Sequence, residues 1–271
     1  KTTTIPSDIA ICKDCIDDIF DKNNFRYNYS LTNCTNCGPR YSIIKTVPYD
    51  RKNTSLKDFT LCKKCQNEFE NPTNRRYHAQ AISCEECGPT TFLYDSKQTL
   101  IASKIDAINL ASKYINDGKI LAIKSMGGFH IVCDASNDET IFRLRELKKR
   151  ATKPFAVMFK DVDSLRNYAI YSNLEREILT SQQRPIVLLQ KKENQNLSNL
   201  VAPNIKKIGC FLPNSALHYL LFENLSNPII ATSANLKGEP IITTKEDIFL
   251  KLCNLVDFVL DYNREILNSC D

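Results

Sequence analysis

Eight of the twelve cysteines in this chain form four CxxC pairs, and thiolates at this spacing are typical metal ligands. Eighteen residues separate the first pair from the second, and eighteen separate the third from the fourth. The second half of this region repeats the first at an offset of fifty residues. The pattern predicts a duplicated region with two four-thiolate zinc sites. The predicted ligands are Cys12, Cys15, Cys34, Cys37, Cys62, Cys65, Cys84 and Cys87.

The chemistry of zinc explains this spacing. Two residues between cysteines let both sulfurs face one ion, and a second pair completes a tetrahedral shell with no position left for catalysis. Gly38 and Gly88 follow the second pair of each repeat and allow a tight turn, so that amide groups can face the sulfurs. The remaining negative charge needs cations nearby, and the candidates are Arg26, Arg40, Arg75 and Arg76.

The spacing alone leaves the pairing open. One site per repeat is the simplest closure, but a cross-braced pairing fits the spacing equally. Four disulfides in a secreted domain are the weaker interpretation, because matched CxxC pairs suit metal better. Thiolate sites in a chain that opens without a secretion signal lead us to expect a reducing cytoplasm.

The second half of the chain contains a glycine pair directly after an apolar strand, at Lys124 to His130. Open α/β sheets bind ligands where strands end. Gly127 and Gly128 would let backbone amides approach an anion, and Lys124 could neutralise it. His130 is then either a ligand contact or an ordinary hydrogen-bonding residue.

Two further stretches have polar side chains that could bind phosphate. Six of the eleven residues from 143 to 153 are Lys or Arg, and this run continues past a predicted helix end into Lys153-Pro154. Residues 231–235 place hydroxyl and amide groups after another predicted strand. Each stretch also has a plain interpretation, as a solvated helix face or as a turn. The cations are Arg143, Arg145, Lys148, Lys149, Arg150 and Lys153.

Composition sets the broad class. The chain has 271 residues, 42% hydrophobic and 25% charged, with a formal net charge of +5. This is typical of a globular protein with room for two domains, and it allows an anionic ligand without demanding nucleic acid. No apolar run approaches the ~20 residues of a membrane span. The four other cysteines are expected to be ordinary thiols: Cys133, Cys210, Cys253 and Cys270.

These residues require two kinds of scaffold. Residues 1–95 lack long periodic segments, so zinc should supply much of the folding free energy of a tandem finger domain, with 47–51 as a linker turn. Residues 96–271 alternate apolar runs with amphipathic segments, which predicts an α/β domain with one twisted sheet. Helices are expected at 104–117, 138–150, 161–168, 173–180, 215–222 and 245–252, and strands at 120–123, 155–159, 186–189, 208–212, 229–232 and 256–260.

The motifs in this order resemble the HypF family of hydrogenase maturation carbamoyltransferases. The first region is similar to that family's tandem zinc finger, and the second to its YrdC/Sua5-type domain. The runs that carry the resemblance are Cys34–Arg40, Pro48–Arg51, Asn74–Ala79, Ile123–Ala135, Leu144–Arg150, Lys153–Ala156, Arg184–Leu188 and Thr232–Asn235.

The resemblance implies an adenylate-forming enzyme. Such a domain binds ATP with magnesium and joins a carbamoyl group, derived from carbamoyl phosphate or carbamate, to the α-phosphate. Lys148, Arg150 and Lys153 would hold the triphosphate, and Ser233 and Asn235 would contact the nucleotide. Lys124, Gly127, Gly128 and His130 would line the carbamoyl pocket, with Lys124, His130 and Lys153 as the catalytic residues.

The family also carries an acylphosphatase domain before this region and a transferase domain after it. The latter passes the carbamoyl group to the partner HypE, where it becomes the cyanide ligand of nickel–iron hydrogenase. We therefore expect an excised part of a longer protein, which forms the adenylate without completing the transfer.

Two alternatives stay open. Threonylcarbamoyl adenylate synthases of tRNA modification share the YrdC-like fold, but they lack the zinc tandem, and their hydroxyl-rich threonine segment is replaced here by Lys124 to His130. A zinc-finger module that binds nucleic acid would need a larger basic and aromatic cluster than Arg75, Arg76 and Tyr77. Binding of double-stranded RNA is suggested by analogy of fold alone.

Overall fold

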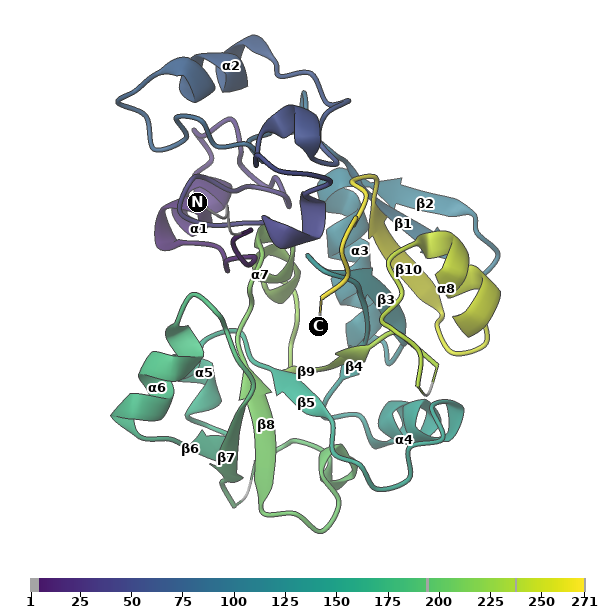
Figure 1. Ribbon diagram of the computed structural model, residues 1–271. Coiled ribbons are helices and arrows are strands. Elements are labelled where there is room, and N and C mark those ends of the chain that lie inside the picture. The colour runs from purple at the N-terminus through teal and green to yellow at the C-terminus, as the bar shows by residue number, and fades with distance from the viewer. Residues whose placement is uncertain (1–4, 194, 237, 271) are drawn as a thin grey trace.

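A computed structural model describes residues 5–193, 195–236 and 238–270. The cysteine-rich region lies against one side of an α/β domain (Figure 1). Each repeat contains one short helix, α1 (Lys13–Phe20) and α2 (Lys63–Glu70). Each helix begins directly after the first cysteine of its repeat, because Cys12 and Cys62 are extended N-cap residues. The helical turn then brings Cys15 and Cys65 back beside them. The repeats also contain the 3₁₀ turns η1 (Tyr41–Ile43) and η2 (Arg51–Asn53).

The α/β domain is built on one mixed sheet, and its ten strands within the described residues lie in the order β2-β1-β10-β3-β4-β9-β5-β8-β7-β6. Only the pairs β10–β3 and β5–β8 in that part of the chain are parallel. The strands are β1 (Thr91–Asp95), β2 (Leu100–Ser103), β3 (Leu121–Lys124), β4 (Phe129–Asp134), β5 (Ala156–Met158), β6 (Ala169–Ile170), β7 (Val187–Lys191), β8 (Lys207–Phe211), β9 (Ile229–Ser233) and β10 (Phe258–Tyr262).

Helices cover both faces of this sheet. Buried side chains of α3 and α7 belong to one apolar cluster, and those of α4, α6 and α8 belong to another. The helices are α3 (Lys104–Asn116), α4 (Asp138–Leu147), α5 (Val162–Leu165), α6 (Asn173–Thr180), α7 (Ala216–Phe222) and α8 (Lys245–Leu252), with the 3₁₀ turn η3 (Asn199–Val201). No helix among these residues combines the length and apolar character needed to cross a bilayer.

Each predicted helix and strand of the α/β domain is present, with two corrections to helix length. The helix predicted over 138–150 ends at Leu147, because Lys149 has a left-handed φ of 48° that ends the repeat of helical hydrogen bonds. The helix predicted over 161–168 is the short α5. Four strands were not predicted: β1, β2, β4 and β6. The first strand of the sheet, β1, already begins at Thr91.

The first repeat packs directly on the α/β domain. Ile11 and Ile19 share one buried apolar cluster with Leu217 of α7. Two backbone hydrogen bonds fix the chain ahead of α1 to the domain: Ala10 N–H to Gln182 O at 2.9 Å, and Ile11 N–H to Asn214 O at 3.0 Å. The second repeat has its own small cluster, around Cys65 and Ile82. The first repeat is therefore part of the domain core, whereas the second packs mainly through the first.

The segment at 47–51 is more than the linker turn that we expected. Arg51 donates hydrogen bonds from Nη1 to the carbonyls of Gln80 (2.9 Å) and Ile82 (2.7 Å). Its Nη2 donates to the carbonyl of Phe59 at 2.8 Å. One guanidinium thus holds three backbone acceptors of the second repeat, which fixes the junction between the repeats.

We predict that Arg51→Gln lowers the free energy of unfolding by about 2 kcal/mol, because it leaves partly buried carbonyls without a donor. The measurement is chemical denaturation of the zinc-loaded chain. Lys52→Gln, at the exposed neighbouring position, is the matched control and should change little. Equal losses in both variants would show that charge alone matters here.

Candidate functional site

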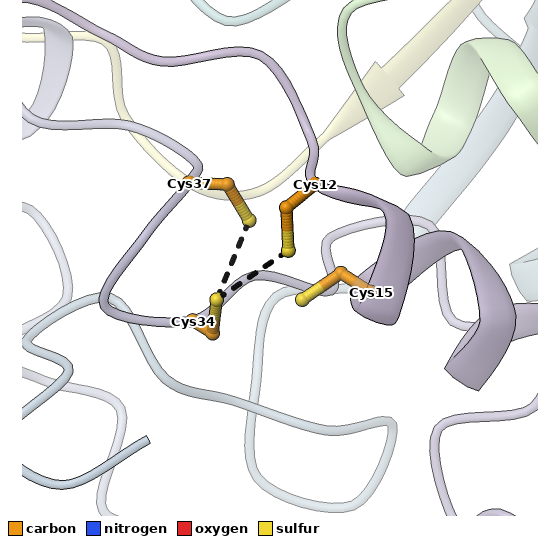
Figure 2. A group of neighbouring side chains, drawn as sticks. All are labelled: Cys12, Cys15, Cys34 and Cys37. Atoms are coloured by element: carbon orange, nitrogen blue, oxygen red, sulfur yellow. Dashed lines mark hydrogen bonds between the residues drawn. The ribbon is translucent and has the colours of Figure 1, made fainter. Parts of the chain in front are cut away.

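The eight predicted zinc ligands form two separate clusters, one from each repeat: Cys12, Cys15, Cys34 and Cys37, then Cys62, Cys65, Cys84 and Cys87. Within each cluster all four sulfurs lie within 4.8 Å of one another. Figure 2 shows the first cluster: the side chains of Cys12 and Cys15, at the start of α1, point toward those of Cys34 and Cys37. This arrangement is the pairing of one site per repeat, and the cross-braced alternative is not what the chain adopts.

The spacing of the sulfurs fits zinc. Cys34 Sγ lies 3.7 Å from Cys12 Sγ and 3.8 Å from Cys37 Sγ. Cys84 Sγ lies 3.6 Å from Cys62 Sγ and 3.7 Å from Cys87 Sγ. A tetrahedron with Zn–S bonds of about 2.3 Å has edges of about 3.8 Å. Since four thiolates fill such a shell, each cluster suits a structural ion.

Three of the four predicted arginines lie against the sulfurs. Arg26 Nη2 is 3.3 Å from Cys65 Sγ, and Arg75 Nη1 and Arg76 Nη2 are 3.0 Å and 3.7 Å from Cys15 Sγ. Arg40 instead donates to the backbone carbonyls of Pro39, Cys34 and Thr35, so its contacts are with the loop and not with sulfur.

The glycines also act differently from the expectation. Gly38 has a φ of 93°, so it makes the tight turn, but its N–H donates to Ile9 O at 2.7 Å. The Gly88 N–H likewise donates to a carbonyl, that of Cys84. Amides that do face a sulfur come from other residues, such as Asn36, whose N lies 3.4 Å from Cys34 Sγ, and Glu86, which bonds to Cys84.

In the α/β domain, two members of the basic run are structural. Arg143 pairs with Asp257 through Nη1 (2.9 Å) and Nη2 (2.7 Å). Arg145 is buried and donates to the carbonyls of Leu200, Arg150 and Lys153. It thereby anchors the loop after α4 to η3. The cations that this loop presents are Lys148, Lys149, Arg150 and Lys153.

This loop meets the end of β9. Lys148 Nζ donates to Ser233 O at 2.7 Å, and Arg150 Nη1 donates to Thr232 Oγ1 at 3.2 Å. Ser233 Oγ in turn donates to Asn235 Oδ1 at 3.1 Å. His130 of β4 is the cross-strand partner of Ser233. Five of the predicted site residues therefore lie at one junction of β4, β9 and the α4 loop, and the exposed Lys153 is on the same loop.

Lys124 lies one strand away, in a buried ion pair that the sequence did not suggest. Its Nζ is 3.0 Å from Asp261 Oδ1 of the parallel strand β10 and donates to Tyr262 O at 2.9 Å. The two side chains are 7% and 9% exposed. Burial, only partly offset by the partner's charge, lowers the pKa of Lys124 and raises that of Asp261. The register pairs Lys124 with Phe129 and His130 with Ile123. Lys124 and His130, two of the three predicted catalytic residues, therefore have side chains on opposite faces of the sheet.

The glycine pair makes the hairpin between β3 and β4 narrow. Ser125 N–H donates to Gly128 O at 2.8 Å, which closes the turn. A Cβ on Gly127 would lie 2.2 Å from Cys270 Sγ, and one on Gly128 would lie 2.6 Å from a methyl of Ile241. Gly127 is therefore needed for close packing against Cys270, and Gly128 for close packing against Ile241. Beside this turn is a small cavity of about 30 Å³ between the first repeat and α7, and Lys124, Thr32 and Arg264 are among its lining residues.

The sequence reasoning missed Asp261, Arg264 and His218. Arg264 Nη2 donates to the hydroxyl of Tyr262 at 2.9 Å, and that hydroxyl donates to Ser125 O. His218 of α7 is buried, and desolvation lowers its pKa to about 3, with a smaller effect of the nearby His130. Asp261 follows a predicted apolar strand directly, which was the available signal for a polar group at a strand end.

Two family models match this chain. The Sua5/YciO/YrdC model, described as telomere recombination, matches residues 113–271, and a model described as HypF finger matches residues 11–44 and 61–94. The chain therefore belongs to the Sua5/YciO/YrdC family and carries a pair of HypF-type fingers ahead of that domain.

The relatives that match the whole chain are HypF carbamoyltransferases. The "Probable carbamoyltransferase HypF" of Methanocaldococcus jannaschii is 49% identical over 270 residues, which are 99% of this chain and 35% of that protein. HypF of T. kodakarensis superposes with a TM-score of 0.95 at 44% identity, and full-length HypF in a phosphate- and nucleotide-bound form with 0.93 at 42%. Each structure matches 98% of this chain, which spans 35% of each. The chain thus corresponds to the finger and YrdC-like part of HypF and to about a third of its length.

The threonylcarbamoyl adenylate synthases are more distant. A putative threonylcarbamoyl-AMP synthase of Methanocaldococcus jannaschii is 24% identical over 58% of this chain. The P. abyssi Sua5 structure complexed with L-threonine superposes with a TM-score of 0.51 at 21% identity, which is a likeness of fold alone.

The buried pair of Lys124 and Asp261 generates a stability prediction. Asp261→Asn should lower the free energy of unfolding by about 3 kcal/mol, because an ammonium group is then buried without its partner charge. Glu223→Gln, which breaks the exposed pair with Lys160, should cost less than about 1 kcal/mol. Denaturant titration of both variants tests this, and similar losses would contradict a role for burial.

Proposed function

We propose that this chain is the adenylate-forming part of a carbamoyltransferase. It binds ATP with magnesium at the junction of β4, β9 and the α4 loop. A carbamate oxygen attacks the α-phosphorus, the bond to the oxygen that bridges the α- and β-phosphates breaks, and carbamoyl adenylate and pyrophosphate result.

The observation that carries this proposal is the convergence of the α4 loop on β9. Lys148 Nζ lies 2.7 Å from Ser233 O, and Arg150 Nη1 lies 3.2 Å from Thr232 Oγ1. Cations and hydroxyls that meet at a strand end suit a polyphosphate, and they can stabilise the negative charge that grows at the phosphate during adenylation. Nucleotide binding by a HypF of similar fold supports the same assignment.

In this proposal Lys148, Arg150 and Lys153 hold the triphosphate, and Ser233 and Asn235 contact the nucleotide. His130 lies across from Ser233 and faces the reacting end. Lys124 with Gly127 and Gly128 shapes the turn beside the carbamoyl pocket. Because Lys124 already pairs with Asp261, its charge would act on the substrate only where that pair opens or shares its proton.

The eight cysteines would hold two structural zinc ions, which fits a reducing cytoplasm. In this proposal the carbamoyl group would come from carbamoyl phosphate and would pass to HypE through the longer protein. This chain would supply the adenylate for that transfer. The alternative as a zinc-finger nucleic-acid binder loses its main support, since Arg75 and Arg76 are engaged with Cys15 and Asp18.

The proposal predicts a product that mass spectrometry can identify. The zinc-loaded chain is incubated with ATP and magnesium, with carbamate (from bicarbonate and ammonia) in one sample and bicarbonate with threonine in another. We expect carbamoyl adenylate in the first sample alone. Threonylcarbamoyl adenylate in the second sample would instead place the chain in tRNA modification.

We also predict that Lys153→Ala weakens ATP binding about tenfold, the loss of roughly one charge-assisted phosphate contact. Titration calorimetry measures the affinity. Lys160→Ala, an exposed lysine beyond β5, is the control. Unchanged affinity in a folded Lys153→Ala chain would remove Lys153 from the site.

A further inference from the structure

The contacts of the arginines follow the duplication but cross between the repeats. Arg26 of the first repeat lies 3.3 Å from Cys65 Sγ in the second. Arg76, its equivalent at the offset of fifty, lies 3.7 Å from Cys15 Sγ in the first. Cys15 and Cys65 are themselves equivalent positions. Each repeat therefore places a guanidinium against the cluster of the other.

Further hydrogen-bond and ion-pair partners of the Arg26 and Arg76 side chains also lie in the opposite repeat. Arg26 Nε donates to Ser83 O at 2.9 Å, and Arg76 Nε donates to Asn33 O at 3.0 Å. Arg26 also pairs with Glu68 at 2.5 Å, and Arg76 pairs with Asp18. Ser83 and Asn33 are equivalent positions, as are Glu68 and Asp18. The crossed contacts are thus a repeated packing arrangement, in which a carbonyl and a carboxylate of the opposite repeat orient each guanidinium, and Arg76 also lies 3.5 Å from Glu68 of its own repeat.

These contacts are buried, so the charges interact with little screening by water. The Arg26 and Arg76 side chains are 0% and 4% exposed. A divalent ion with four thiolates is an anion, and a buried anion requires a nearby cation. Hydrogen bonds and charge just outside the ligand shell typically change metal affinity by 10–100-fold.

We propose that each zinc cluster is neutralised by arginine from the opposite repeat, so that retention of each metal depends on the fold of both repeats. The inference rests on the proposal that the clusters hold zinc. The repeats resemble two independent fingers in sequence, but they form one unit in which each completes the site of the other.

The two clusters differ in the number of arginine side chains that contact their sulfurs. Arg75 adds a second guanidinium to the first cluster, with Nη1 3.0 Å from Cys15 Sγ. The equivalent position in the first repeat is Phe25, whose ring lies under Arg26 with 4.3 Å from the ring centroid to Cζ. Within the described part of the chain, the second cluster therefore has one guanidinium in contact with Cys65 Sγ where the first has two at Cys15 Sγ. Arg51 acts on Cys65 and Cys87 through its charge. Its last ligand, Cys87, is also less buried than Cys37. We expect zinc to leave the second cluster first.

The test measures loss of metal from each cluster separately. The full zinc-loaded chain is treated with EDTA and N-ethylmaleimide, and peptide mass mapping follows the alkylation rate of each cysteine. Cys133 and Cys210 are fully buried in the α/β core and report on global unfolding. Wild-type cysteines in the clusters should be protected without EDTA. Rapid labelling there would show that they hold no metal and would overturn the zinc proposal itself.

Arg26→Gln should increase the initial labelling rate of Cys62, Cys65, Cys84 and Cys87 about tenfold or more, ahead of any change at Cys12 to Cys37. Arg75→Gln, at a partly exposed arginine of the second repeat, should do the reverse and act first on Cys12 to Cys37. Lys64→Gln, an exposed cation of the second repeat near Phe25, is the control and should change neither cluster.

The proposal would be overturned by faster labelling only in the repeat that carries the mutation, or by no change in either cluster. If Cys133 and Cys210 of the Arg26→Gln chain are alkylated as quickly as its cluster cysteines, that chain has unfolded. The Arg75→Gln variant then decides whether the arginine contacts cross between the repeats. Arg26→Lys keeps a positive charge and should restore much of the protection of the second cluster.

Discussion

Negative charge on buried sulfur is the constraint on which the cysteine-rich half depends. Cys15 and Cys65 are fully buried, and the first cluster shares its apolar surroundings with α7 of the α/β domain. Thiolates in such a place are stable only with a metal and with cations held in fixed positions. Arg26, Arg75 and Arg76 satisfy this need, and their own burial requires Glu68 and Asp18. A chain of opposite charges thus runs through both repeats and makes them one structural unit.

The α/β half solves a related problem with a single buried arginine. The loop from 148 to 154 has no regular structure, yet it must hold several cations close together against their mutual repulsion. Arg145 binds the carbonyls of Arg150, Ala151 and Lys153 from within, and it joins them to the carbonyl of Leu200. The loop is fixed mainly through its backbone, and Arg150 adds hydrogen bonds to the carbonyls of Lys153 and Pro154 while it also reaches Thr232 of β9. Of the basic run in the sequence, Arg143 and Arg145 therefore serve the scaffold, whereas Lys148 and Arg150 reach the end of β9.

Much of this architecture could be predicted because local sequence encodes it. The eight predicted zinc ligands follow from cysteine spacing, although their division into two clusters needed the structure, and apolar periodicity locates α3, α7 and β9. The missed strands lack such a signal: β6 has two residues, β2 is largely exposed, and β4 begins in a stretch that read as a ligand-binding turn. Contacts between segments far apart in the sequence could not be predicted from the sequence. Asp261 becomes the partner of Lys124 only through the parallel register of β10 with β3, and the crossing of the arginines exists only after the two repeats pack.

The position of β10 has a consequence for synthesis of the chain. Of the ten described strands of this sheet, β10 is the last in chain order, yet it lies between β1 and β3, which are made far earlier. Until it arrives, both early strands present unpaired backbone edges, and the apolar side chains of Leu93 and Ile123 lack part of their cover. Closing the sheet requires contacts across most of the domain's length, which slows folding. The sheet can therefore close only after translation of the domain is complete, and the nascent chain is at its most aggregation-prone just before that point.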